Sequence, residues 1–176
     1  MSPPLWLLDV DGVLNALSAR PGRATWPDWE WGTAAVHGVD WPIRFAPAVS
    51  AYVTAVHADD RADVRWLTTW GSGANGELAR LLGLPQLAVA GEPPEAGGLA
   101  DAEGVGRWWK ADVVRTLVLA DPGRPLLWTD DDLAHEPRVT HWVGAHAARS
   151  LCLAPDPVTG LSPSDLARVD AFFDGA

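Results

Sequence analysis

The chain has 176 residues, the length of one ordinary domain, and its 48% hydrophobic and 20% charged residues exclude intrinsic disorder. Its longest apolar runs are short segments such as Leu5–Leu8, whereas a transmembrane helix needs about 20 apolar residues in a row. The net charge of -10 at pH 7 disfavours binding to nucleic acid or to an anionic membrane, because both are negatively charged.

The content of cysteine and lysine is unusually low. The only cysteine, Cys152, has no partner for an internal disulfide, which suits a reducing compartment. The N-terminus shows no basic stretch followed by a long apolar segment, so no secretory signal is expected and we expect a cytoplasmic protein. Lys110 is the only lysine in a chain whose other basic residues are arginines, which suggests a specific role for it.

The first quarter of the chain predicts a buried strand, a flap and a helix. Leu5–Leu8 is a continuous apolar run, which is typical of a strand buried on both faces. Residues 16–45 are rich in Pro, Gly and Trp and lack a helical period, so we expect a small flap there, with a hairpin over 31–45. A helix is expected over 47–57, because Pro47 suits a first helical turn and apolar residues follow on one face.

The rest of the chain alternates strands with helices. We expect strands over 64–68, 87–90, 126–129 and 150–153, helices over 75–82, 108–119 and 162–173, and a mobile Gly/Pro-rich loop over 91–106. This alternation favours an α/β fold, a Rossmann-like three-layer sandwich with a central parallel sheet and no large cap domain. We expect residues 1–176 to form a single domain.

Polar side chains follow several of these strands. Asp9 and Asp11 follow the first, Thr68 ends the second, and Asp130 and Asp131 follow the strand over 126–129. Parallel strands end at one edge of a sheet, so these groups are expected to converge there. Each close carboxylate pair costs on the order of 4 kcal/mol at an effective dielectric near 20. The group therefore predicts a bound cation, and hard oxygen ligands suit Mg²⁺.

Four segments resemble, in order and placement, the four signatures of the haloacid dehalogenase (HAD) superfamily. They are Asp9-Val10-Asp11-Gly12, Trp66-Leu67-Thr68-Thr69, Lys110 and Trp128-Thr129-Asp130-Asp131, and the resemblance covers roughly residues 5–153. An aspartate two residues after the first one resembles the phosphatase branch rather than the dehalogenases. The resemblance implies a HAD-like fold and a phosphatase that acts on phosphomonoesters of small molecules.

The resemblance also implies a role for each matching residue. Asp9 would be the nucleophile that forms an aspartyl-phosphate, and Asp11 the general acid and then the general base. Thr68 would bind the phosphoryl oxygens, with Thr69 the less favoured candidate. Lys110 would stabilise the charge on nucleophile and phosphate.

The expected metal is Mg²⁺. Its protein ligands would be Asp9, the backbone carbonyl of Asp11, and Asp130, with Asp131 binding directly or through water.

Further residues are candidates for substrate binding. The stretch Thr68-Thr69-Trp70 with Ala74-Asn75, together with Trp109-Lys110, is similar to small bacterial HAD-like proteins that are grouped with nucleic-acid-repair HAD domains. On this basis Thr69, Trp70 and Asn75 are candidate contacts, while Arg20 and Arg23 of the flap are candidates for a second phosphate. The acidic chain argues against a large nucleic acid substrate.

Two alternatives share part of this pattern with a phosphatase. A HAD-like fold without catalytic activity could serve as a binding or regulatory module, and the absence of a cap leaves this open. A receiver domain also gathers Asp, Thr and Lys around Mg²⁺, but its acceptor Asp should end a middle strand ahead of Thr and Lys, and no such residue is present. The sequence indicates neither the individual substrate nor the oligomeric state.

Overall fold

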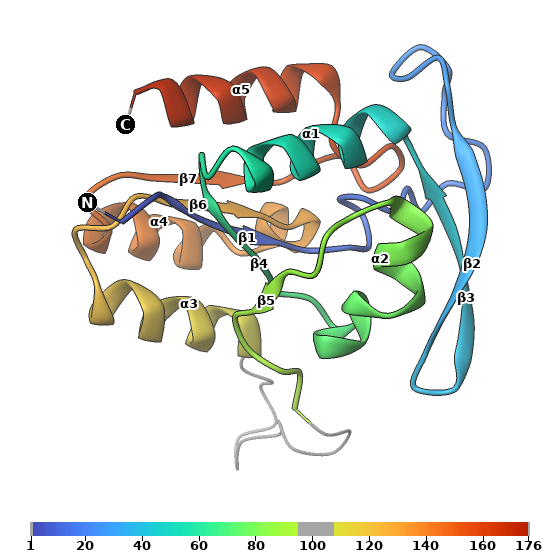
Figure 1. The fold of residues 1–176 in the computed structure, drawn as a ribbon. Coiled ribbons are helices and arrows are strands. Elements are labelled where there is room, and N and C mark those ends of the chain that lie inside the picture. The colour runs from blue at the N-terminus through green and yellow to red at the C-terminus, as the bar shows by residue number, and fades with distance from the viewer. Residues whose placement is uncertain (1, 95–107, 176) are drawn as a thin grey trace.

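The computed structural model describes residues 2–94 and 108–175 of the chain (Figure 1). The mobile loop expected over 91–106 lies outside the described residues from residue 95 onward, and residues 91–94 belong to no helix or strand. None of the described helices has the length and apolar character that a bilayer-spanning helix needs.

A five-stranded parallel sheet forms the middle layer, as predicted. Its order is β5-β4-β1-β6-β7, and β1 pairs in parallel with both β4 and β6. The strands are β1 (Leu5–Leu8), β4 (Asp63–Trp66), β5 (Ala88–Val89), β6 (Leu126–Thr129) and β7 (Ser150–Leu153). After β1 the chain builds one side of the sheet through β4 and β5 and then returns to build the other side through β6 and β7. The topological switch therefore lies at β1, where α/β sheets bind their ligands.

Helices cover both faces of this sheet (Figure 1). On one face lie α1 (Pro47–Ala58) and α5 (Pro163–Asp174), and on the other lie α3 (Trp109–Ala120) and α4 (Pro137–His146). The fold is therefore α/β in three layers and Rossmann-like, in agreement with the prediction.

Strand β1 shows why its sequence is apolar throughout. Trp6 and Leu8 belong to the core beneath α1 and α5, whereas Leu5 and Leu7 belong to the core on the α3 and α4 side. All four side chains are buried, because successive residues of a strand point to opposite faces and both faces are covered.

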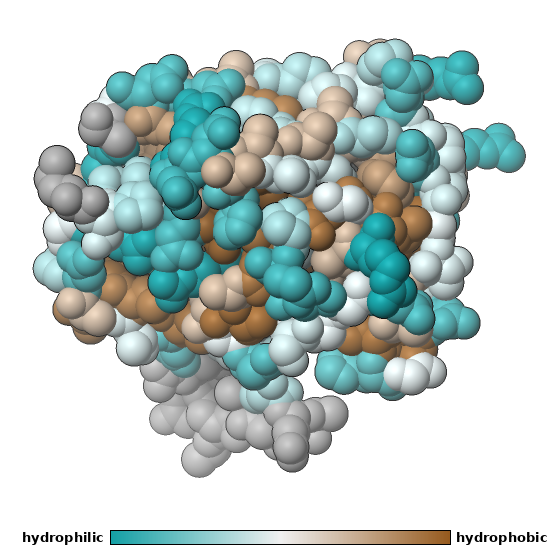
Figure 2. Space-filling view, viewed as in Figure 1, coloured by the Kyte–Doolittle hydropathy of each residue, from teal (hydrophilic) through white to brown (hydrophobic). Residues whose placement is uncertain are grey.

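The hairpin expected over 31–45 is confirmed as an antiparallel pair outside the main sheet. Its strands are β2 (Glu30–Val36) and β3 (Val39–Phe45), joined by a two-residue turn in which His37 and Gly38 both have positive φ. Such a turn matches the twist of the flanking strands. Figure 2 shows apolar residues at the surface beside this hairpin, and further apolar areas at the lower left and near the centre of the same face.

Two helical regions differ from the prediction. The helix expected over 75–82 is a 3-10 turn, η1 (Gly71–Asn75), followed by α2 (Glu77–Leu82), because the backbone at Gly76 is not helical. The sequence also predicted no bounds for α4, which begins at Pro137 after the 3-10 turn η2 (Asp131–His135).

Candidate active site

The candidate site lies at the carboxyl ends of the three central strands. Asp9 follows β1 directly and Asp130 follows β6 directly, and both continue the ladder through backbone hydrogen bonds to the neighbouring strand. Thr68 lies two residues beyond β4 and is fully buried. The three residues thus occupy adjacent positions at the switch point of the sheet.

Lys110 joins the two carboxylates. Its Nζ donates to Oδ2 of Asp9 at 2.8 Å and to Oδ2 of Asp130 at 2.8 Å, and all three side chains are almost inaccessible to solvent. Lys110 is the second residue of α3, so the start of this helix brings the ammonium group to the strand ends. The sequence analysis expected this convergence, over separations of 101 and 20 residues.

Burial governs the protonation of these groups. It raises the pKa of Asp9 despite the opposing charge and hydrogen bond of Lys110 and a hydrogen bond from Thr68. Burial, together with the charge of Asp9, raises the pKa of Asp130 to about 7. Burial acts against the charge of Lys110, but the carboxylates of Asp9 and Asp130 outweigh it, and the pKa of Lys110 is raised.

A third carboxylate completes a set of oxygen donors. Asp9, Asp130 and Asp131 each offer a carboxylate oxygen, and these oxygens all lie within 4.8 Å of one another. Burial and the charges of Asp132 and Asp9 raise the pKa of Asp131 to about 6.

This donor set fits a divalent cation. When ionised, the three carboxylates carry three negative charges, and the ammonium of Lys110 balances only one of them. Burial is the main cause of the raised pKa values of these carboxyls, and neighbouring carboxylate charges add to it at Asp130 and Asp131. Hard oxygen ligands and a remaining demand for two positive charges are what Mg²⁺ satisfies.

Gly12 allows Asp131 to approach this set. Its φ is +70°, a conformation that favours glycine, and a Cβ atom placed on it would collide with the carboxylate of Asp131. The glycine that follows Asp11 is thus required both by the turn after β1 and by the proximity of the η2 residue.

Asp11 lies beside the carboxylate set without belonging to it. Its Oδ1 accepts a hydrogen bond from Nδ2 of Asn15 at 2.7 Å, and its Oδ2 accepts one from the indole Nε1 of Trp70 at 2.9 Å. Asn15 in turn accepts a hydrogen bond from the backbone N–H of Arg44 in β3, which ties Asp11 to the base of the hairpin. Both oxygens of this partly exposed carboxylate are therefore held in fixed directions.

The three consecutive residues 68–70 lie in different environments. Thr68 is buried next to Asp9, and its Oγ1 accepts a hydrogen bond from the backbone N–H of Trp70. Thr69 is exposed and lines a cavity beside Asp11. Trp70, expected as a substrate contact, is 3% exposed, and its polar atom is engaged with Asp11, so it supports the site more than it offers a free surface.

Three other expected substrate contacts form no hydrogen bond or ion pair with these carboxylates in the part of the chain that the structure describes. The side chain of Asn75 makes three hydrogen bonds within the fold: its Oδ1 accepts from Trp66 Nε1 and from the backbone N–H of Leu87, and its Nδ2 donates to the Leu87 carbonyl. Arg20 and Arg23 are exposed, and neither lines the cavity beside Asp11. Asn75 is therefore a structural residue that fastens η1 to the segment before β5.

Sequence reasoning missed Asn15 and the contact between Trp70 and Asp11. Asn15 had one available signal, since it is a single polar residue among Val13, Leu14 and Ala16, all of which are buried. Trp70 and Asp11 are 59 residues apart in the sequence, and no local sequence pattern predicts their hydrogen bond.

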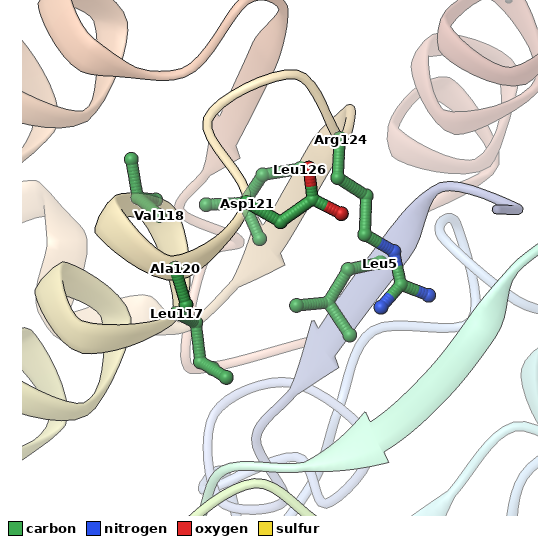
Figure 3. Close-up of a pocket in the computed structure, with 7 residues that line it drawn as sticks. All are labelled: Leu5, Leu117, Val118, Ala120, Asp121, Arg124 and Leu126. Carbon is green, nitrogen blue, oxygen red and sulfur yellow. The ribbon is translucent and has the colours of Figure 1, made fainter. Parts of the chain in front are cut away.

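A separate cavity of about 210 Å³ lies at the opposite ends of the strands (Figure 3). Leu5 and Leu126, the first residues of β1 and β6, line it together with residues from the end of α3. The guanidinium of Arg124 at its edge already bonds the carbonyl of Pro3 and the carboxylate of Asp63. This cavity is mostly apolar and is remote from the carboxylate set.

Comparisons of the chain with models of protein families, with curated proteins and with solved structures found no match.

Proposed function

We propose that this protein is a Mg²⁺-dependent phosphomonoester hydrolase of the HAD-like type, acting on a phosphorylated small molecule through an aspartyl-phosphate on Asp9. The observation that carries the proposal is the position of the single lysine of the chain, 2.8 Å from the carboxylates of both Asp9 and Asp130. Buried carboxylates around one ammonium, at the switch point of a parallel sheet, match the needs of phosphoryl transfer.

The first step is attack on phosphorus. An oxygen of the Asp9 carboxylate forms a bond to phosphorus, the ester P–O bond breaks, and an aspartyl-phosphate results. Lys110 touches one oxygen of Asp9 and supplies positive charge to the phosphoryl oxygens. Thr68, buried next to Asp9, would donate a hydrogen bond from its hydroxyl group to a phosphoryl oxygen.

Asp11 transfers the proton in both steps. It gives its proton to the departing alkoxide, and as a carboxylate it then takes a proton from the water that attacks the aspartyl-phosphate. Inorganic phosphate leaves and Asp9 is regenerated. The hydrogen bonds from Asn15 and Trp70 hold the carboxyl group in one orientation for both tasks.

Mg²⁺ held by Asp9, Asp130, Asp131 and the backbone carbonyl of Asp11 would neutralise charge on the phosphoryl group. The charge balance of the buried set supports this assignment, because Lys110 leaves two carboxylate charges unmatched.

The test is phosphate release from generic phosphomonoesters by the wild type, with Mg²⁺ and with a chelator. We expect turnover with Mg²⁺ only, and Asp9→Asn should fall below about a thousandth of the wild-type rate. Asp59→Asn, at the exposed end of α1, is the matched control and should retain activity. A wild type that releases no phosphate from any ester would favour the alternative, a HAD-like binding module without catalytic activity.

A further inference from the structure

A cavity of about 230 Å³ opens directly beside Asp11. Its lining is mainly apolar: Val36, Val39 and Trp41 come from the hairpin, and Trp70 comes from the segment after β4. The volume lies below the roughly 300–1,000 Å³ of pockets that enclose drug-sized ligands. The cavity therefore suits a small group.

The hairpin turns one face toward this cavity. In its register Trp41 pairs with Ala34 and Val39 pairs with Val36, so these residues share the face of the buried Ile43. Toward the tip this inner face loses its cover, and Trp41 and Val39 are each 49% exposed. Half-exposed apolar side chains on an inward face mark a surface that a ligand can cover.

The proposed chemistry fixes what must lie in the cavity. Asp11 has to be within about 2.6–3.2 Å of the ester oxygen to which it gives its proton. The organic part of the substrate begins at that oxygen, and the cavity that Asp11 lines is next to it.

The charges of the lining select among leaving groups. Among the described residues, the lining contains neither lysine nor arginine; its polar side chains are the carboxylate of Asp11, the imidazole of His37 and the hydroxyl of Thr69. An anionic tail would meet the carboxylate of Asp11 with no lysine or arginine to balance it, and a cationic tail would lose its hydration against Val36, Val39 and Trp41. An uncharged, apolar tail gains from burial against the same side chains.

We infer that this cavity binds the leaving group of the substrate, and that the preferred substrates are phosphomonoesters of small, uncharged, apolar alcohols. The inference rests on the proposed phosphatase function and adds the substrate class. It assigns specificity to the inner face of the hairpin, chiefly to Trp41, in place of the arginines of residues 16–29.

The experiment compares hexyl phosphate with methyl phosphate and with ω-amino and ω-carboxy alkyl phosphates of similar chain length. All are esters of alcohols, so leaving-group acidity stays similar and the tail is the main variable. We expect kcat/KM to rise from methyl to hexyl by up to about fourfold per buried methylene, and to fall at least about tenfold for either charged tail.

Two tryptophan variants locate the effect. Trp41→Ala should lower kcat/KM for hexyl phosphate about tenfold and change kcat/KM for methyl phosphate less than about twofold. Trp31→Ala is the matched control, because Trp31 is 58% exposed on the same hairpin but pairs with Arg44 on the outer face. Trp31→Ala should leave kcat/KM unchanged for both substrates.

Binding of non-hydrolysable alkylphosphonates, measured by calorimetry, separates this inference from the phosphatase proposal. Preference for the hexyl tail without turnover of any ester would contradict the phosphatase and keep the apolar site. Turnover with no preference among the tails, or with equal loss in the two tryptophan variants, would overturn the leaving-group site alone. Absence of both binding and turnover would overturn both.

Discussion

Lys110 is the residue on which the electrostatics of the site depend. Two buried carboxylates share its ammonium, and removal of one partner from a buried ion pair costs more than the pair contributes, because a charge is left uncompensated. The same residue would be needed for chemistry and for folding, so the two roles have to be separated by pH.

We predict that Lys110→Met lowers the free energy of unfolding by about 3–5 kcal/mol at a pH near 8 in the absence of Mg²⁺. The loss should shrink at a pH near 5, because carboxyls whose pKa values are already raised become neutral there and need no counter-charge. Urea denaturation at both pH values measures this. Arg115→Met, on the partly exposed side of the same helix, should cost about 1 kcal/mol or less at either pH, and an equal loss in both variants would contradict the role of Lys110.

Trp70 is a positioning residue for Asp11. Trp70→Phe keeps an aromatic ring and removes the N–H that holds Oδ2 of Asp11. Impaired proton donation matters most for poor leaving groups, so kcat for methyl phosphate should fall about tenfold or more, and that for p-nitrophenyl phosphate much less. Trp66→Phe is the control, because it removes an indole hydrogen bond to Asn75 rather than to Asp11. An equal fall for both esters in Trp70→Phe would show that the residue is merely structural.

At the scale of elements, the turn after β1 and the start of η2 depend on each other. Asp131 occupies the space that a side chain at residue 12 would take. Gly38 at the hairpin turn has a similar φ of +76° but nothing within 4 Å of its Cβ position. A comparison of substitutions at Gly12 and Gly38 therefore distinguishes the effect of backbone strain from the effect of displacing Asp131.

We predict that Gly12→Ala and Gly38→Ala each cost about 1–3 kcal/mol of stability through strained backbone. Only Gly12→Ala should weaken Mg²⁺ binding, by about tenfold or more, because only there does the new methyl group push a ligand carboxylate away. Calorimetric titration with Mg²⁺ measures the difference. Equal Mg²⁺ affinities in the two variants would remove Asp131 from the metal site.

The sequence predicted the elements whose patterns are set by local burial. Leu5–Leu8 is apolar because β1 is covered on both faces, and the hairpin of residues 30–45 is marked by its turn and its lack of helical period. The bounds of α4 were not predictable because only Val139 and Val143 of its residues are buried, which leaves a weak apolar stripe. The break at Gly76 was missed because hydrogen bonds of Asn75 to distant residues decide it.

For the whole molecule, the carboxylate set was predictable because parallel topology brings strand ends together whatever lies between them. The proximity of Asp9, Lys110 and Asp130 follows from the strand order, once each residue is assigned to the end of a strand or the start of a helix. The cavity beside Asp11 was not predictable, because its walls depend on how the hairpin packs back against the segment after β4. Packing of this kind leaves no periodic trace in the sequence.

Mg²⁺ binding at the proposed site would be coupled to the release of protons. The pKa of Asp130 is raised to about 7 and that of Asp131 to about 6, from the ordinary 3.8. At pH values between the ordinary 3.8 and these raised values, the folded chain holds protons that the unfolded chain has released. Without Mg²⁺, the contribution of these two carboxyls to the free energy of unfolding therefore falls as the pH rises from about 4 to about 7. Mg²⁺ requires the ionised carboxylates and therefore displaces the protons.

We predict that Mg²⁺ binding releases protons at a pH near 6 and almost none at a pH near 8, and that the affinity rises between the two. Calorimetry in two buffers with different ionisation enthalpies measures the number of protons released. Stabilisation by Mg²⁺ with the same affinity at both pH values and no proton release would contradict the assignment of Asp130 and Asp131 as ligands.

The most direct test of the account is to find the phosphoryl group on the protein. Asp11→Asn removes the proposed general base for the attacking water. After mixing with Mg²⁺ and p-nitrophenyl phosphate and quenching in acid, this variant should carry phosphate on the peptide that contains Asp9, as detected by mass spectrometry. Asp9→Asn treated in the same way should carry none. Phosphate on another residue, or release by Asp9→Asn at the wild-type rate, would contradict the central claim that Asp9 is the nucleophile.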